Sequence, residues 1–116
     1  MSETEELGRG GRLSGRAADE LVAAAFAAES AHGPRLAHGL SLADLAHAVA
    51  LVEGGDLAGA DARALLRGLL ELHEIPGDEF PWDPALGDAF NSREAELERR
   101  IGRSAAGWLS AGRPRR

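Results

Sequence analysis

The chain has 116 residues, of which 44% are hydrophobic, and a formal net charge of −6. This length suffices for one modest hydrophobic core, and it argues against an enzyme with separate cofactor and substrate domains. The absence of cysteine excludes disulfides, thiolate nucleophiles and Cys-ligated zinc or iron–sulfur sites. No run of about 18 consecutive apolar residues is present, so no membrane span is expected. The acidic start has no apolar region typical of a secretory signal. We therefore expect a soluble, cytoplasmic protein.

The overall negative charge argues against general nucleic-acid binding, because affinity for phosphates requires an excess of clustered positive charge. All 13 basic residues are arginines, and the one concentrated basic run is Arg113-Pro114-Arg115-Arg116. Such a run could contact an anion or a nucleic acid, although short charged runs at chain ends are usually only solvated.

Residues 1–15 carry several glycines and few apolar side chains, which predicts a flexible lead-in. A first helix is expected from Arg16 to about Ser30, because the segment is rich in strong helix formers. Gly33-Pro34 is expected to end it. The apolar face predicted for this helix comprises Leu21, Val22, Ala25 and Phe26.

Ser41 predicts the start of a second helix, since its hydroxyl can cap backbone N–H groups and Asp44 follows three residues later. Gly54-Gly55 should close this helix. Its predicted apolar face comprises Leu42, Leu45, Val49 and Val52. A third helix is expected from about Gly59 to His73, with an apolar stripe of Leu65, Leu66, Leu69, Leu70 and Leu72.

Three prolines between Ile75 and Pro84 predict an irregular or extended crossing segment. A fourth helix follows from about Gly87 to Gly102, with a narrow apolar seam and a possible i, i+4 ion pair between Glu96 and Arg100. The seam comprises Phe90, Leu97 and Ile101. No strand pattern is evident. The prediction is an all-α fold, a small bundle of about four helices that forms a single domain over 16–116.

Few residues are candidates for metal binding, catalysis or ligand binding. The four histidines lack the spacing of a metal motif, so no metal site is predicted. His47 follows Asp44 by three residues, which suits either an oriented imidazole or, more commonly, an ion pair on a helix surface. Trp82 is expected to anchor the crossing segment to the core rather than to stack on a ligand. The carboxylates Glu94, Glu96 and Glu98 are typical of a solvated helix face, and no catalytic residue or cofactor is predicted.

The motifs occur in an order that resembles the N-terminal part of argininosuccinate lyase, a member of the fumarase/aspartase superfamily. The resemblance covers essentially the whole chain but only about the first quarter of such a lyase, and it implies the predicted helical fold. The segments that carry it are Gly10-Gly11-Arg12-Leu13, Phe26 with Arg35-Leu36, Ala46-His47, Phe80-Pro81-Trp82-Asp83-Pro84, Asp88, Glu94, Leu97, Ile101-Gly102, Ala106-Gly107 and Leu109.

The departures from the family fall where the resemblance places substrate contacts. Phe90 and Ser92 stand at the positions of a substrate-contacting His and Asn. In the family's His-Thr-Gly-Arg-Ser-Arg-Asn stretch, this chain keeps Arg113 and Arg115 but has Pro114 in place of the serine. Proline removes both a hydroxyl and a backbone N–H from a loop expected to bind a carboxylate. Ser92, Arg113 and Arg115 therefore remain the candidate substrate-binding residues.

The resemblance also implies that the family's catalytic serine and central helical bundle belong to a region absent from this sequence, and that its sites combine three subunits. We expect no lyase activity from this chain alone, because catalysis needs several groups positioned together. One hypothesis is a truncated, degenerate lyase-like domain, a pseudoenzyme that acts as a binding or interaction module. The alternative is a component or fragment of an argininosuccinate lyase, a carbon–nitrogen lyase of arginine biosynthesis that releases fumarate and arginine, completed by a lyase-like subunit. A third reading is an unrelated helical adaptor.

Overall fold

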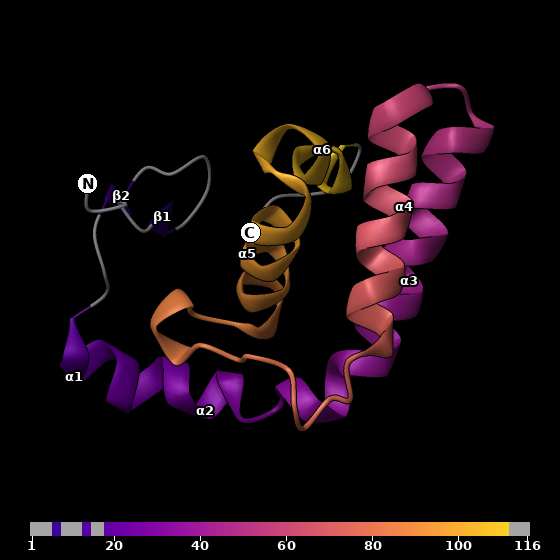
Figure 1. Ribbon diagram of the computed structural model, residues 1–116. Coiled ribbons are helices and arrows are strands. Elements are labelled where there is room, and N and C mark those ends of the chain that lie inside the picture. Colours follow the sequence, from indigo (N-terminus) through magenta and orange to yellow (C-terminus); the bar gives the residue numbers. More distant parts are fainter. Residues whose placement is uncertain (1–5, 8–12, 15–17, 112–116) are drawn as a thin grey trace.

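A computed structural model describes residues 6–7, 13–14 and 18–111 of the chain. Within these residues the fold is almost entirely helical, as predicted, and Figure 1 shows its arrangement. Its elements in chain order are β1 (Glu6–Leu7), β2 (Leu13–Ser14), α1 (Asp19–Leu21), a π-helical turn (Val22–Phe26), α2 (Ala27–Ser30), α3 (Gly33–Glu53), α4 (Gly59–Glu74), a 3-10 turn (Pro84–Leu86), α5 (Ala89–Ile101), α6 (Arg103–Gly107) and a second 3-10 turn (Trp108–Ser110).

The predicted boundary between the first two helices is wrong. Helix α3 begins at Gly33, where we expected a helix to end, and the turn that separates it from α2 lies at residues 31–32. Pro34 fits the first turn of α3 because the N–H groups of that turn have no acceptor within the helix. Ser41 consequently lies inside α3 and does not cap a helix.

The buried face of α3 also differs from the prediction. Four side chains of α3 are buried at positions that each precede a predicted core residue by one: Ser41, Asp44, Ala48 and Leu51. A shift of one residue rotates the contact face by about 100°. Leu42 and Val49, expected in the core, remain 49% and 43% exposed. Small side chains at positions 41 and 48 instead face the neighbouring helices, and Asp44 is buried with an ionic partner.

Helix α4 packs along α3 and supplies the centre of the core, as Figure 1 shows. Leu65, Leu69 and Leu72 are buried as predicted, whereas Leu70 is 52% exposed. Helix α5 approaches α4 closely at Gly68, where an added Cβ would lie 2.9 Å from Leu97 Cδ1. This glycine therefore sets the distance between the two helices.

The crossing segment is irregular, and Trp82 anchors it as predicted. The indole lies against Gly33, where an added Cβ would come within 2.5 Å of the ring, and its Nε1–H donates to the Gly77 carbonyl at 2.7 Å. Phe80 packs beside it with ring centroids 4.4 Å apart. The crossing is thus tied to the start of α3 and to the core.

The helical segment from α1 to α2 extends away from the α3–α4 pair and contacts the turn Pro84–Leu86 (Figure 1). Its predicted apolar face is largely uncovered: Leu21 is 45% exposed and Phe26 is only partly buried. In the expected lead-in, β1 and β2 form a two-residue antiparallel pair that the sequence pattern did not predict. Residues 10–12 of the Gly-Gly-Arg-Leu motif lie outside the described residues.

By length and composition alone, α3 could cross a membrane, with a mean hydropathy of 1.2 in its most apolar window. Within the bundle, however, α3 packs against α4 and α5 and carries a buried, ion-paired Asp44. Of this window, 22% is buried inside the bundle.

Candidate functional site

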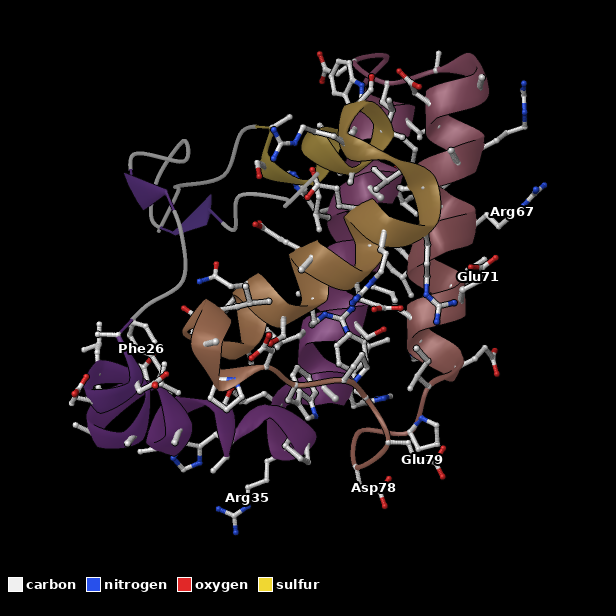
Figure 2. The ribbon with its side chains drawn as sticks, turned by 60° about the vertical axis from the view of Figure 1, so that its left-hand side comes forward. Phe26, Arg35, Arg67, Glu71, Asp78 and Glu79 are labelled. Atoms are coloured by element: carbon white, nitrogen blue, oxygen red, sulfur yellow. The ribbon has the colours of Figure 1, made fainter. Side chains whose placement is uncertain are left out.

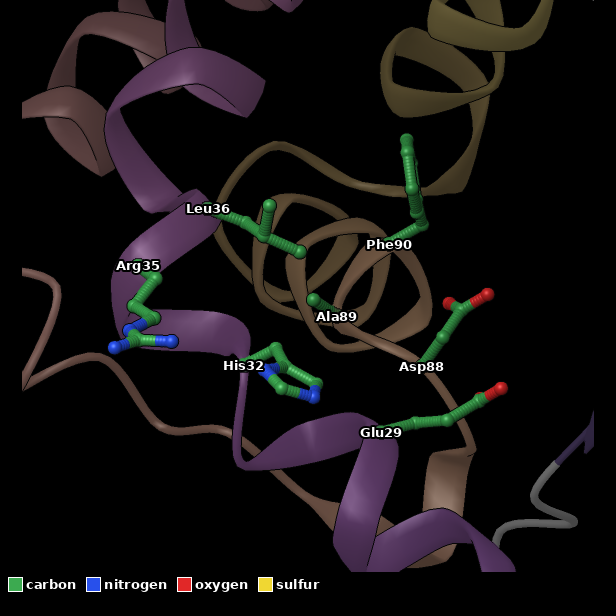
Figure 3. Close-up of a pocket in the computed structure, with 7 residues that line it drawn as sticks. All are labelled: Glu29, His32, Arg35, Leu36, Asp88, Ala89 and Phe90. Carbon is green, nitrogen blue, oxygen red and sulfur yellow. The ribbon is translucent and has the colours of Figure 1, made fainter.

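An open cavity of about 420 Å³ lies where the junction of α2 and α3 meets the start of α5 (Figure 3). We call it the junction cavity. It is lined by Glu29, His32, Arg35, Leu36, Asp88, Ala89 and Phe90.

Charged and apolar groups share the walls of the junction cavity. Figure 3 shows the carboxylates of Glu29 and Asp88 extending to the same side, below the Phe90 ring. Asp88 is fixed because it caps α5, accepting a hydrogen bond from the Asn91 backbone N–H at 3.1 Å. Arg35 extends outward from the opposite wall, as Figure 2 shows. Such a cavity can hold a small amphipathic ligand with a cationic group beside the carboxylates.

Sequence reasoning did not identify this cavity. Glu29 and Asp88 stand on different elements far apart in the chain, and the resemblance that includes Asp88 does not link it to Glu29. Phe90 was predicted to join Leu97 in a core seam, but it lines the junction cavity while Leu97 is 1% exposed in the core. The prediction fails for Phe90 because it lies at the start of α5, where it faces the cavity.

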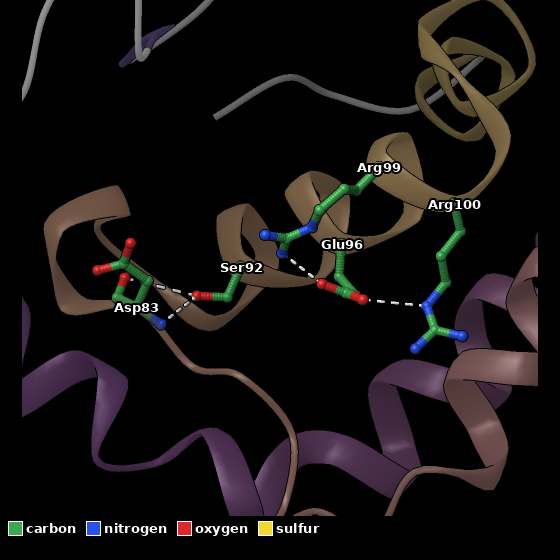
Figure 4. A network of polar contacts seen from close by, with 5 residues as sticks. All are labelled: Asp83, Ser92, Glu96, Arg99 and Arg100. Atoms are coloured by element: carbon green, nitrogen blue, oxygen red, sulfur yellow. Dashed lines mark hydrogen bonds and ion pairs between the residues drawn. The ribbon is translucent and has the colours of Figure 1, made fainter. Parts of the chain in front are cut away.

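Ser92, a predicted substrate-binding residue, is buried at 2% exposure between α5 and the crossing segment. Its hydroxyl oxygen accepts a hydrogen bond from the Asp83 backbone N–H at 2.9 Å, as drawn in Figure 4. The nearby Asp83 carboxylate accepts from Ala85 N–H at 2.9 Å and begins the first 3-10 turn. Ser92 thus connects the crossing to α5 and does not line the junction cavity. Arg113 and Arg115 lie outside the described residues.

His47 is used in a contact that its spacing from Asp44 did not indicate. Its Nε2 lies 2.7 Å from the Ala111 carbonyl oxygen, so the imidazole N–H donates to the end of the last 3-10 turn. Asp44 accepts instead from the Arg93 guanidinium at 3.3 Å. In this structure His47 ties α3 to the C-terminal side of the bundle.

The predicted ion pair on α5 is confirmed, with Arg100 Nε 3.0 Å from Glu96 Oε1. Figure 4 shows Glu96 between Arg99 and Arg100, and Arg100 also reaches Glu71 of α4 at 3.3 Å. The hydrogen bond to Glu96 raises the pKa of Arg100 above its usual value. This network joins α5 to α4 at the surface and has the character of a structural contact. Within the part of the chain that the structure describes, no group of three or more His, Asp or Glu side chains could hold a metal ion.

Comparison with known proteins gives one family in common. The chain is 34% identical over 107 residues to the argininosuccinate lyase of Methanoculleus marisnigri, a match that covers 92% of this chain and 21% of that protein. It is 42% identical over 72 residues to the enzyme of Maricaulis maris, and 34% identical over 74 residues to that of Methanocaldococcus jannaschii, each match covering 15% of the relative. No family model and no solved structure matches.

The resemblance indicated by the motifs is therefore confirmed by independent matches that cover 61% to 92% of this chain. The chain spans only 15% to 21% of the length of these relatives. Over most of its own length, the chain is an argininosuccinate-lyase-like sequence.

Proposed function

We propose that this protein is an argininosuccinate-lyase-like domain that acts as a cytoplasmic interaction module and docks onto a helical lyase-like subunit. The observation that carries the proposal is an uncovered apolar stripe on α3. Its members are Leu42, Ala46 and Val49, which are all exposed, flanked by the half-buried Leu45. We call this stripe the outer face of α3.

The outer face suits another helix. Its residues follow one another at three- and four-residue spacing, which is the pattern of a helix contact surface. Gly39 and Ala46 are small, so a partner backbone can approach closely. The relatives extend far beyond the matched segment, and a helical region of such a protein is the occupant that we propose.

Co-expression with an argininosuccinate lyase that lacks the matching segment tests this proposal. The chain is expected to form a stable complex, measured by size exclusion with light scattering and intact mass, and to release no fumarate. Leu42→Glu should weaken the complex about tenfold or more, because it places a charge in an apolar contact. Leu70→Glu is the matched control, since Leu70 is equally exposed on α4 but lies off the outer face.

A second candidate is that the chain is a working component of an argininosuccinate lyase. The junction cavity favours it, because Phe90 stands where the resemblance places a substrate contact and lines a cavity with Glu29 and Asp88. On this proposal Ser92, Arg113 and Arg115 would bind substrate, the two arginines gripping a carboxylate.

The same co-expression separates the two candidates. A complex without fumarate release supports the interaction module, whereas a complex that cleaves argininosuccinate supports the lyase component. Failure of the well-folded partner to bind the chain would overturn both.

A further inference from the structure

A second cavity, of about 180 Å³, lies beneath the crossing segment between α3 and α4. We call it the histidine cavity. Its polar walls are His38, Ser41, His73 and Arg93, and its floor and rim include Leu72 and Gly77. Gly77 closes tightly over α3, because a Cβ added there would lie 2.7 Å from the Pro34 carbonyl oxygen. The Trp82 indole holds Gly77 in this position by a 2.7 Å hydrogen bond.

Ser41 and His73 form a linked pair in this cavity. The Ser41 Oγ lies 2.8 Å from His73 Nδ1, and Ser41 is only 2% exposed. When Ser41 donates to Nδ1, the neutral imidazole carries its proton on Nε2. The Nε2–H group takes no part in the contact with Ser41 and can donate to another acceptor. When both ring nitrogens carry a proton, Nδ1–H donates to the Ser41 oxygen, and the Ser41 O–H can then donate to another acceptor. In either state, the pair retains a donor beyond its mutual hydrogen bond.

Arg93 contributes a fixed cation to the same cavity. Asp44 accepts hydrogen bonds from its Nε and Nη2 atoms, each at 3.3 Å, and the guanidinium has five N–H donors in total. The residue is 3% exposed, and its guanidinium carbon lies 5.7 Å from the centre of the Phe80 ring. The ion pair and the ring hold the guanidinium in place before any ligand binds.

The charge and the hydrogen-bond donors of these groups indicate which kind of ligand the cavity can bind. A metal ion is disfavoured, because Arg93 would repel it and the neighbouring His38 and His73 rings, 5.8 Å apart, would supply only two nitrogen ligands. Donors from a hydroxyl, two imidazoles and a guanidinium suit the oxygens of an anion. A cavity of about 180 Å³ has room for a small anion.

We propose that the histidine cavity is a binding site for a small oxyanion, either a carboxylate or a phosphate. Arg93 and the Ser41–His73 pair donate to the anion from the interior, and His38, which is exposed, stands at the entrance. Asp44 neutralises much of the charge of Arg93, and the chain is acidic overall, so the affinity is modest, with a Kd on the order of 1 mM. This site does not depend on the outer face of α3 or on any lyase partner.

The test is a titration of the full chain followed by ¹H–¹⁵N NMR, with inorganic phosphate in one arm, acetate in the second, and chloride at equal ionic strength as the control. The expected result is saturable shifts of the Ala37 and Gly77 amides with at least one oxyanion and none with chloride. The arm with the lower Kd identifies which oxyanion geometry the site prefers.

Two variants and one control locate the binding. His73→Leu and Ser41→Ala are each expected to weaken binding about tenfold, since each removes a polar side chain of the Ser41–His73 pair from the cavity. His47→Gln should bind as the unmodified chain does, because His47 contacts Ala111 and not the cavity. Circular dichroism checks that each variant is folded. The absence of saturable shifts at the cavity amides, or unchanged affinity in both cavity variants, would overturn the proposal.

Discussion

Asp44 of α3 and Arg93 of α5 form an ion pair with a nitrogen–oxygen distance of 3.3 Å, and their side chains are only 7% and 4% exposed. The pair joins two helices whose residues stand 49 positions apart in the chain. It also settles which face of α3 is turned inward, because a buried carboxylate must meet a compensating charge.

Removing one member of this pair should be strongly destabilising. We expect Asp44→Ala to lower the free energy of unfolding by about 3–5 kcal/mol, because Arg93 would remain buried without its counterion. The measurement is urea denaturation followed by circular dichroism. The double variant Asp44→Leu/Arg93→Met should recover most of the loss, since apolar side chains of similar volume can replace a buried ion pair. A loss below about 1 kcal/mol in the single variant would show that the pair behaves like a surface contact.

The packing of Trp82 on Gly33 predicts opposite effects for two alanine substitutions in the same helix. Gly33→Ala should destabilise the protein by about 1–3 kcal/mol, because the new methyl group would come within 2.5 Å of the indole ring. Gly39→Ala should stabilise it by about 0.5–1 kcal/mol, because no atom lies within 4 Å and alanine is the better helix former. Urea denaturation of both variants, with near-ultraviolet circular dichroism for the indole, makes the comparison. Equal effects at the two sites would contradict the close packing.

Helix α4 and the crossing segment could be predicted from sequence because each has an unambiguous local signal. In α4 the leucines at positions 65, 69 and 72 recur at helical spacing, and all three are buried. The crossing follows from its prolines, which cannot occupy a helix interior. Helix α3 lacks such a signal. It is rich in alanine and apolar around most of its circumference, so periodicity does not decide which side packs.

The missed features all depend on partners distant in sequence. Gly33-Pro34 is compatible with a helix end or a helix start, and the choice depends on Trp82 seated against Gly33. Ser41 resembled an N-cap, but its hydroxyl meets His73, 32 positions away. Neither the junction cavity nor the histidine cavity has a local motif, since each collects residues from separate elements.

The rotation of α3 can be tested by placing the same charge on its two faces. Leu42→Glu should leave the free energy of unfolding within about 0.5 kcal/mol of the original value, because Leu42 is 49% exposed. Ala48→Glu should lower the free energy of unfolding by about 4 kcal/mol or more. Position 48 is fully buried, so the new carboxylate would have neither water nor a compensating charge around it. Both values come from urea denaturation. If Leu42→Glu proved the more damaging of the two, the predicted face would be the buried one after all.

The Glu96 network predicts a small contribution that depends on salt. Glu96→Gln should lower the free energy of unfolding by about 0.5–1 kcal/mol at low ionic strength, because its arginine partners are partly exposed to water. The difference between the two proteins should shrink in about 1 M salt, where screening acts over about 3 Å. Thermal unfolding at two salt concentrations provides the check, and an effect that persists undiminished in high salt would indicate a hydrogen-bonding role rather than an ionic one.

Ser92 offers a test that separates a structural role from a substrate contact. Ser92→Ala should reduce the free energy of unfolding by about 1–3 kcal/mol, because the Asp83 N–H would lose its acceptor in a buried place. Asn91→Ala is a useful variant for comparison. The Asn91 side chain donates to the Leu86 carbonyl at 2.6 Å and so holds the turn Pro84–Leu86 against α5. Both variants should loosen the attachment of the crossing to α5 and lower the urea midpoint. If Ser92→Ala left stability unchanged but reduced fumarate release by a lyase complex containing this chain, its hydroxyl would act on the substrate, and the lyase component would become the better account of the protein.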